Sequence, residues 1–462
     1  MKKWTINIKK FYQISLLFII VVIFCIVTIN KKTADSISAL VIITFVLNLF
    51  ISFFSFLSSV KTHPYSFCVM FWLFNFVFLC IAPLVQYMAD WTSWGLVTTD
   101  NEIIKCNLLI TLWQLCFYIG TKNRLRIKKN RKKQAGFPRE VNRWGILTVF
   151  IISFVFTSIL FLTNGISGLL LRGARVGVSE NSTLSLLFFH VFRNTILYTF
   201  VVLILAVKKH RSPVFLCVFA CFMFLLACFP TSISRYMAGA FYLGLIIIFL
   251  GKEKCSIWYT SFVFLGLTVA FPVLSFFRNL KTLSAIYSVR EIVKTSITGT
   301  YLTGNYDAHN MIISAFHYTD TFGFSYGKQL IGALLFFVPR SIWPGKPIGT
   351  GATVVSSLQQ SSFTNVSMPF IGESYINFGV VGVVFFAVIV GSVVSRIDRA
   401  YWANKDDFRI INIIYPFVIF YFFFLQRGDM MSAGAYLIAN AVVGVLIVKT
   451  STKNFERSEY NH

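Results

Sequence analysis

Six basic side chains stand near the ends of apolar stretches, where they could bind an anionic group. They are Arg340, Arg278, Arg235, Lys346, Arg172 and Arg175. A guanidinium binds phosphate oxygens two at a time and stays protonated at physiological pH. A fixed cation beside a leaving phosphate lowers the barrier to reaction, and one such donor is typically worth about 3–4 kcal/mol. The alternative is that each side chain is a membrane-interface anchor or a member of a local ion pair.

Three further side chains could act as the base that removes a proton from an attacking hydroxyl: Glu373, His309 and Asp307. Each also has a structural explanation. Glu373 opens a predicted helix, where an acidic residue is favoured by the helix dipole. His309 can be a hydrogen-bonded loop histidine, and Asp307 can form a turn with Asn305 and Tyr306. The sequence leaves both explanations open for all three.

The elements that must position these side chains are apolar. Of the 462 residues, 56% are hydrophobic and 13% are charged, whereas soluble domains carry about 25% charged residues. Roughly 20 apolar residues are enough to cross a bilayer. The expected spans are 11–29, 37–57, 67–89, 103–121, 144–163, 184–207, 213–231, 236–250, 256–277, 371–395, 410–426 and 431–448. The chain is therefore predicted to be an all-α polytopic membrane protein of about 12 transmembrane helices.

Basic residues gather in the connections that fall on one side of these spans. The formal net charge is +25, and ten basic residues lie between positions 122 and 143 alone. The positive-inside rule places this basic loop and both chain termini in the cytoplasm. Because topology explains the charge, we expect membrane lipid as a partner and no nucleic acid.

Residues 278–370 break the pattern of short connections and are expected on the outer face. Their aromatic and aliphatic content predicts a folded segment rather than a linker. The run 326–338 is too short to cross and is typical of an interfacial or re-entrant helix. The following Trp343 favours the membrane boundary, which places Arg340 near it. Residues 278–373 carry seven basic and four acidic side chains, a net charge of +3. This excess runs against the topology rule and suggests an anionic ligand presented from the membrane.

The chain therefore divides into three parts. Residues 1–277 hold helices 1–9, residues 278–370 form the outer segment with the expected site, and residues 371–462 hold helices 10–12 and a cytoplasmic tail.

Two stretches resemble the O-antigen polymerases of the Wzy type. They are VPRSIWPGKPIGTGATV (338–354) and MPFIGESYINFGVVG (368–382), while SRYMAG (234–239) fits more loosely. Members of this family have many helices and a large periplasmic loop. Some are described by an arginine followed by ten residues and a glycine, a spacing that Arg340 and Gly351 match. The family's longer Arg-to-Gly spacing has no counterpart in residues 164–183.

The resemblance implies a glycosyltransferase C-like membrane architecture in the bacterial inner membrane. Such enzymes act on oligosaccharide repeat units carried on undecaprenyl diphosphate. At the periplasmic face, the growing chain is transferred to the non-reducing end of a new unit and undecaprenyl diphosphate is released. No cofactor, nucleotide sugar or metal is implied, and a chain-length regulator is a candidate partner. Periplasmic arginines are the family's usual functional candidates, which places Arg340 first and Arg278 second, with Arg235 and Lys346 assisting.

Two other functions remain open, an O-antigen ligase and a flippase or exporter of the lipid-linked unit. The long folded outer segment favours an enzyme over a flippase. No D-x-D occurs and the first outer loop, Asn30–Ser36, is short, which counts against a metal-dependent oligosaccharyltransferase. The nine cysteines lie in or beside the spans, so neither a disulfide framework nor a zinc site is expected.

Overall fold

The structure is a computed structural model that describes residues 36–122, 139–171, 183–251, 263, 301–404 and 408–454. The predicted first span at 11–29 lies outside these residues, as does the predicted ninth span at 256–277 except for Val263. Three of the candidate arginines, Arg278, Arg172 and Arg175, also lie outside them.

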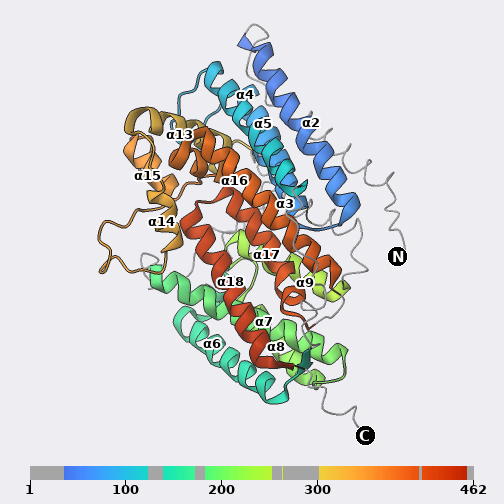
Figure 1. The fold of residues 1–462 in the computed structure, drawn as a ribbon. Coiled ribbons are helices and arrows are strands. Elements are labelled where there is room, and N and C mark those ends of the chain that lie inside the picture. Colours follow the sequence, from blue (N-terminus) through green and yellow to red (C-terminus); the bar gives the residue numbers. More distant parts are fainter. Residues whose placement is uncertain are drawn as a thin grey trace, which may run out of the picture.

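The described chain is mostly helical and has only two short strands, as expected for the predicted all-α class (Figure 1). The long helices are α2 (Ala39–Thr62), α5 (Asp100–Lys122), α6 (Arg143–Leu170), α7 (Thr183–Lys208), α16 (Phe370–Ala403), α17 (Ile410–Arg427) and α18 (Met430–Ser451). Another continuous helix is made of α3 (Phe67–Phe74), the π-helix η2 (Asn75–Ile81) and α4 (Ala82–Met88). The shorter elements are α8 (Val214–Ala227), α9 (Arg235–Leu250), η6 (Gly304–Tyr306), α13 (Ala308–Phe322), α14 (Lys328–Leu334) and α15 (Thr350–Ser357).

Eight of the described helices are long and apolar enough to cross a membrane, and α8 and α9 are shorter apolar helices. Ten of the predicted spans coincide with these elements, which confirms an all-α, multi-pass architecture for the described part of the chain. The total of twelve spans remains a prediction. The helix of Phe67–Met88 is central, because 89% of its 18-residue apolar stretch is buried. Helix α6 is peripheral, because only 33% of the corresponding stretch is buried.

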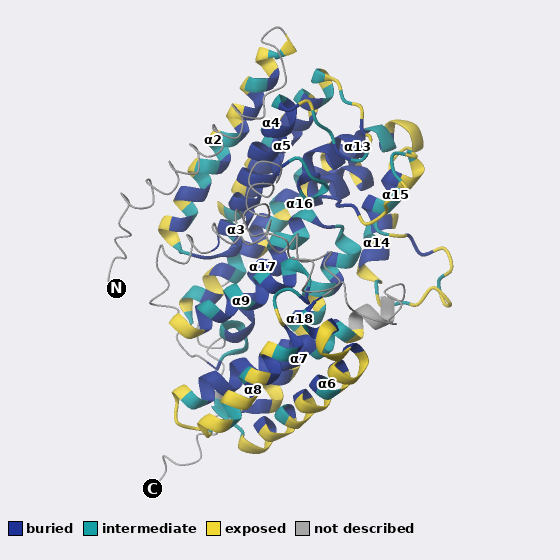
Figure 2. Ribbon diagram, turned by 180° about the vertical axis from the view of Figure 1, so that it is seen from behind, coloured by how far each residue is buried: buried dark blue, intermediate teal, exposed yellow. Residues whose placement is uncertain are grey.

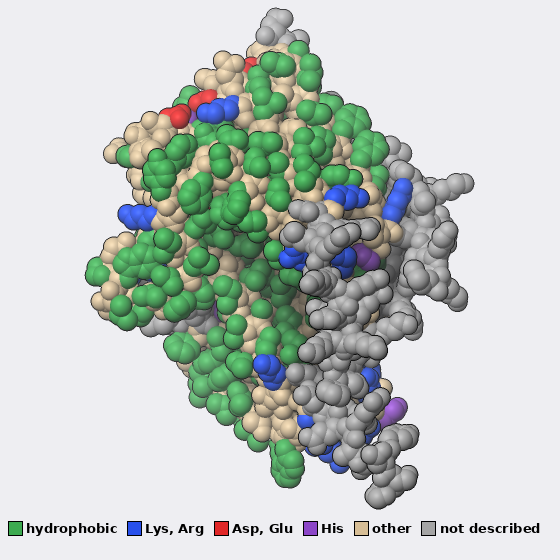
Figure 3. Space-filling model, in the orientation of Figure 1, with side chains coloured by type: hydrophobic (Ala, Val, Ile, Leu, Met, Phe, Trp, Pro, Cys, Tyr) green, Lys and Arg blue, Asp and Glu red, His purple; other side chains and the backbone are tan. Residues whose placement is uncertain are grey.

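Apolar side chains cover the outside of this bundle. Figure 2 shows exposed residues along the outer sides of α2 and α6, with buried residues on their inner sides. Figure 3 shows hydrophobic side chains spread widely over the part of the face that is not grey. A water-soluble protein rarely exposes apolar surface on this scale, so this surface is typical of contact with lipid.

Residues 301–369 pack at one end of the long helices, where α5 and α16 begin and α17 ends (Figure 1). We call this the loop end. Away from the loop end, the two helices pack closely, because Gly120 in the last turn of α5 and Gly391 of α16 each lie against the backbone of the other helix, with no room for a Cβ atom. Small residues allow such close approach between membrane helices. At the opposite end, the strands β1 (Arg139–Val141) and β2 (Thr452–Asn454) pair antiparallel and join the start of α6 to the end of α18.

Candidate functional site

A short turn at the loop end, residues 303–307, is the centre of the candidate site. Gln86 of α4 fixes the turn, because its Nε2 donates to the carbonyl oxygens of Tyr301 at 2.8 Å and Tyr306 at 3.0 Å. Tyr306 is buried, and its ring stacks on Phe78 of η2 with centroids 4.8 Å apart. The turn is therefore anchored directly on the central helix of the bundle.

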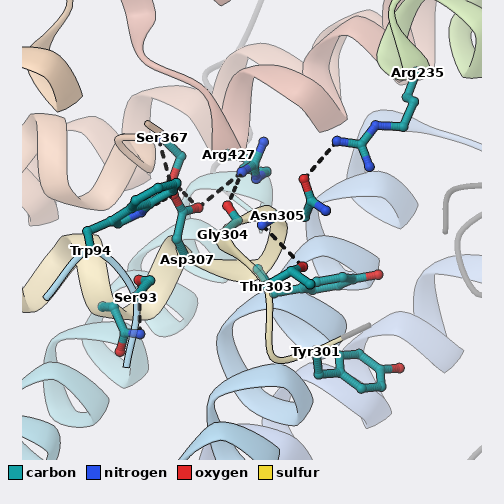
Figure 4. A network of polar contacts seen from close by, with 12 residues as sticks. Ser93, Trp94, Arg235, Tyr301, Thr303, Gly304, Asn305, Asp307, Ser367 and Arg427 are labelled. Atoms are coloured by element: carbon teal, nitrogen blue, oxygen red, sulfur yellow. Dashed lines mark hydrogen bonds and ion pairs between the residues drawn. The ribbon is translucent and has the colours of Figure 1, made fainter. Parts of the chain in front are cut away.

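Two arginines from different helices reach this turn (Figure 4). Arg235 begins α9, and its Nη2 donates to the Asn305 Oδ1 at 2.7 Å. Arg427 ends α17, and its Nη2 donates to the Gly304 oxygen at 2.9 Å and to the Asp307 Oδ1 at 3.1 Å. Burial raises the pKa of the Tyr306 hydroxyl, and the positive charges of Arg235 and Arg427 oppose this rise. The turn thus gathers two cations at the loop end.

Asp307 is the acidic partner within this cluster. Its side chain is fully buried and forms an ion pair with Arg427. It also accepts hydrogen bonds from Trp94 Nε1 at 2.8 Å, from Ser367 Oγ at 2.6 Å and from the Ser367 backbone nitrogen at 3.3 Å. A buried carboxylate is tolerated when it is paired and hydrogen-bonded in this way. With the Arg427 contact, these donors fill the roughly four lone-pair positions of the carboxylate, which favours a positioning role for Asp307 over the role of a base.

Arg427 keeps hydrogen-bonding capacity beyond these contacts. Its side chain is 20% exposed. Within the described part of the chain its Nη1 makes no hydrogen bond, and its Nε is buried without an acceptor. A guanidinium has five N–H donors, so donors on Nη1 remain for an anionic ligand.

Glu373 forms a second polar cluster beside the first. It lies in the first turn of α16 and is 1% exposed. Its Oε2 accepts from Thr350 Oγ1 at 2.7 Å and its Oε1 from the Met430 nitrogen at 2.9 Å. Asp429 caps α18 by accepting from the Ser432 nitrogen at 3.0 Å. Because Asp429 is two residues from Arg427, the connection between α17 and α18 links the two clusters.

His309 faces α5 and contacts neither arginine within the described residues. It is 2% exposed, and its Nε2 lies 3.0 Å from the Asn107 Oδ1. The Asn107 amide nitrogen already donates to Thr44 Oγ1 at 2.9 Å, so its oxygen accepts and the His309 Nε2 carries the hydrogen. Burial lowers the pKa of His309 to about 3. A neutral histidine in this place holds α13 against α5.

Arg340 and Lys346 hold their own loop together. Arg340 Nη1 donates to the Lys346 oxygen at 2.6 Å and its Nη2 to the Pro347 oxygen at 3.0 Å. Lys346 Nζ donates to the oxygens of Phe336 at 2.6 Å and Val338 at 3.0 Å. Burial lowers the pKa of Lys346, and the neighbouring charge of Arg340 adds to this effect. Two of the five donors of the Arg340 guanidinium, one on each terminal nitrogen, therefore bind backbone carbonyls of its own loop.

The interfacial helix predicted at Tyr326–Val338 is also shorter in the structure. Helix α14 ends at Leu334, and the chain then turns, with the Val338 nitrogen donating to the Leu335 oxygen at 3.0 Å. Pro347 packs against Gly332 of α14, next to Met431 of α18. The loop that carries Arg340 thus rests on the start of α18.

The predicted site residues therefore separate into groups. Arg235 and Asp307 meet at the turn, Glu373 lies in the adjoining cluster, His309 packs on α5, and Arg340 with Lys346 forms a separate loop. The site residues that sequence reasoning missed are Arg427, Trp94, Ser367 and Gln86. Arg427 had a usable signal, since it directly follows the apolar run 410–426 just as Arg235 directly precedes 236–250.

No family model matches this chain, and neither does any curated protein or solved structure. The resemblance to the Wzy-type polymerases therefore rests on residues 338–354 and 368–382 themselves.

Proposed function

We propose that the protein polymerises oligosaccharide repeat units linked to undecaprenyl diphosphate, at the periplasmic face of a bacterial inner membrane. The observation that supports this most is the convergence of Arg235 and Arg427 on the turn 303–307, at the loop end of an apolar bundle. The basic residues at the other ends of the helices support an outward-facing loop end.

The proposed reaction needs few groups from the protein. A hydroxyl at the non-reducing end of a new unit attacks the anomeric carbon of the growing chain. The bond from that carbon to the diphosphate oxygen breaks, and undecaprenyl diphosphate leaves with the negative charge. Arg235 and Arg427 stabilise that charge as it develops, which is where fixed donors are most effective. We assign Arg427 the larger share, because its Nη1 donors are unused within the described residues.

The acceptor hydroxyl loses its proton in this step. Glu373 is the best placed of the proposed bases, because it adjoins Asp429 and the Arg427 connection. Its two hydrogen bonds occupy two of the roughly four lone-pair positions of a carboxylate. The contacts with Thr350 and Met430 would then orient the carboxylate rather than block it.

The test is deletion of the gene followed by complementation. Cells without the protein should lose long polysaccharide ladders and keep a surface core capped with a single repeat unit. Loss of the single-unit cap as well would contradict polymerisation and indicate a ligase or a flippase. An accumulation of lipid-linked units on the cytoplasmic side would separate the flippase from the ligase.

A further inference from the structure

We infer that Asp307 is a positioning residue, which orients the Arg427 guanidinium toward an anionic diphosphate at the loop end. The inference deepens the proposed function and rests on it for the identity of the ligand. It starts from the ion pair, in which one nitrogen of Arg427, Nη2, contacts both the Asp307 carboxylate and the Gly304 oxygen. Anchoring one nitrogen in two directions fixes the plane of the guanidinium.

The anchor is itself held firmly. Asp307 accepts from Trp94 Nε1 and from the side chain and backbone of Ser367. Trp94 packs so closely on Gly304 that no Cβ atom would fit there. Asp307 thus receives donors from the connection before α5, from the connection before α16 and from the end of α17. A carboxylate held from three sides can hold an arginine in one orientation.

This arrangement matters because an arginine side chain is flexible. Ordering a long side chain when a ligand binds costs free energy, and a group that is already ordered avoids this cost. In a reacting site, donors that are fixed before the charge develops stabilise it without reorganising. The free edge of Arg427 is then presented to the ligand already oriented.

A purely electrostatic role for Asp307 predicts the opposite effect. Its negative charge lies against Arg427 and would repel a diphosphate, so removing the charge should strengthen anion binding. A positioning role predicts that removing it weakens binding. The sign of the change therefore separates the two roles.

The experiment measures binding of inorganic pyrophosphate to the purified full-length protein by calorimetry. Asp307→Asn should bind about tenfold more weakly than the wild type, the lower end of the 10- to 100-fold effect seen for residues that orient the ligands of a metal ion. In an Arg427→Ala background, the same substitution should have no further effect, because its action passes through Arg427.

Two other variants keep the inference testable if Asp307→Asn does not fold. Ser367→Ala and Trp94→Phe each remove one donor from the Asp307 side chain and leave the ion pair in place. Each should weaken pyrophosphate binding by about two- to tenfold, the usual worth of one hydrogen bond. Asp398→Asn is the matched control, since it alters a buried aspartate in the far part of α16 and should leave binding unchanged.

Unchanged or tighter binding of pyrophosphate by Asp307→Asn would overturn the inference. So would an equally large weakening when Asp307→Asn is added to Arg427→Ala. The proposed function fails separately, if the deletion strain keeps its long ladders. If the variants bind pyrophosphate as described but the deletion strain keeps its long ladders, the positioning role of Asp307 stands and the polymerase assignment fails.

Discussion

Arg427 Nη2 donates to Asp307 Oδ1 across 3.1 Å, although 120 residues separate the two in the sequence. Arg427 is the last residue of α17 and Asp307 immediately precedes α13. The pair therefore holds the outer segment against the bundle, at the same turn where Arg235 donates to Asn305. This junction is the basis of the predictions below.

Replacing Arg427 by lysine should shorten the polymer more than the same change at Arg340. Lysine keeps the charge but loses the planar fork, and one lost donor at a reacting centre typically lowers the rate by about 100- to 1000-fold. Arg340 donates to carbonyls of its own loop, so its loss acts indirectly. Ladder length in the complemented deletion strain, at equal protein level, measures both effects. Equal shortening by the two variants would contradict this ranking, and Arg396→Lys at the opposite end is the control.

Gly351→Ala should disturb the Asp307 cluster from a distance. A Cβ atom at Gly351 would lie 2.6 Å from the Ser367 oxygen and 2.9 Å from the Val366 oxygen. Both neighbours are backbone, so the segment that carries Ser367 must shift, at a typical cost of about 1–3 kcal/mol. We expect shorter ladders and a lower melting temperature.

Gly345→Ala is the matched control, because the nearest atom to its added Cβ, the Trp343 Nε1, lies 4.0 Å away. If both variants behave as the wild type, the packing of α15 on residues 366–367 does not matter for the site.

Acidification should destabilise the protein through His309. Burial lowers the pKa of His309 from 6.5 to about 3, so between these values the unfolded chain binds a proton that the folded chain does not. The contribution of neutral His309 to the free energy of unfolding is therefore fully present above pH 6.5. The free energy of unfolding then falls as the pH drops toward 3, by at most about 1.4 kcal/mol per pH unit. His309→Gln keeps a donor for Asn107 and cannot titrate. Melting temperatures across this range should fall less steeply in the variant, and parallel curves would contradict the assignment.

Asp398→Asn should lower stability without changing the site. The Asp398 carboxylate accepts from the Phe67 nitrogen at 2.9 Å, the Cys68 nitrogen at 3.2 Å and the Tyr415 hydroxyl at 2.5 Å. Asparagine turns one acceptor into a donor, which leaves a buried donor unpaired at a cost of about 1–3 kcal/mol. The melting temperature should fall, while ladder length at low growth temperature stays normal. The exposed Asp320 offers the control substitution Asp320→Asn.

The sequence predicts the helices well, because a run of apolar residues is enough to specify a membrane span. Its limits are visible within single helices. The π-helix of Asn75–Ile81 lies inside the predicted span 67–89 and changes nothing in its hydropathy. Likewise, the predicted span at 371–395 contains a kink, with Gly379 at φ 61°. Hydropathy indicates the length of a span and how apolar it is. It does not depend on the hydrogen-bond pattern of the backbone, so it reveals neither the π-helix nor the kink.

The site is less predictable, since it depends on contacts between distant segments. Arg235 and Asp307 could be named from their residue types and their places near span ends. Their neighbours Trp94 and Ser367 could not, because nothing close to them in the sequence indicates that they meet Asp307. Arg340 shows the converse limit. Its residue type and predicted depth suggest phosphate binding, and only the folded loop reveals that two of its five donors bind carbonyl oxygens of the same loop.

The most direct test of the central claim is the rate at which purified protein in lipid vesicles releases undecaprenyl diphosphate from a lipid-linked repeat unit. The wild type should release it while forming polymer, and Arg235→Lys with Arg427→Lys should slow the release by at least about 100-fold. Polymer formation by the double variant at the wild-type rate would contradict the account.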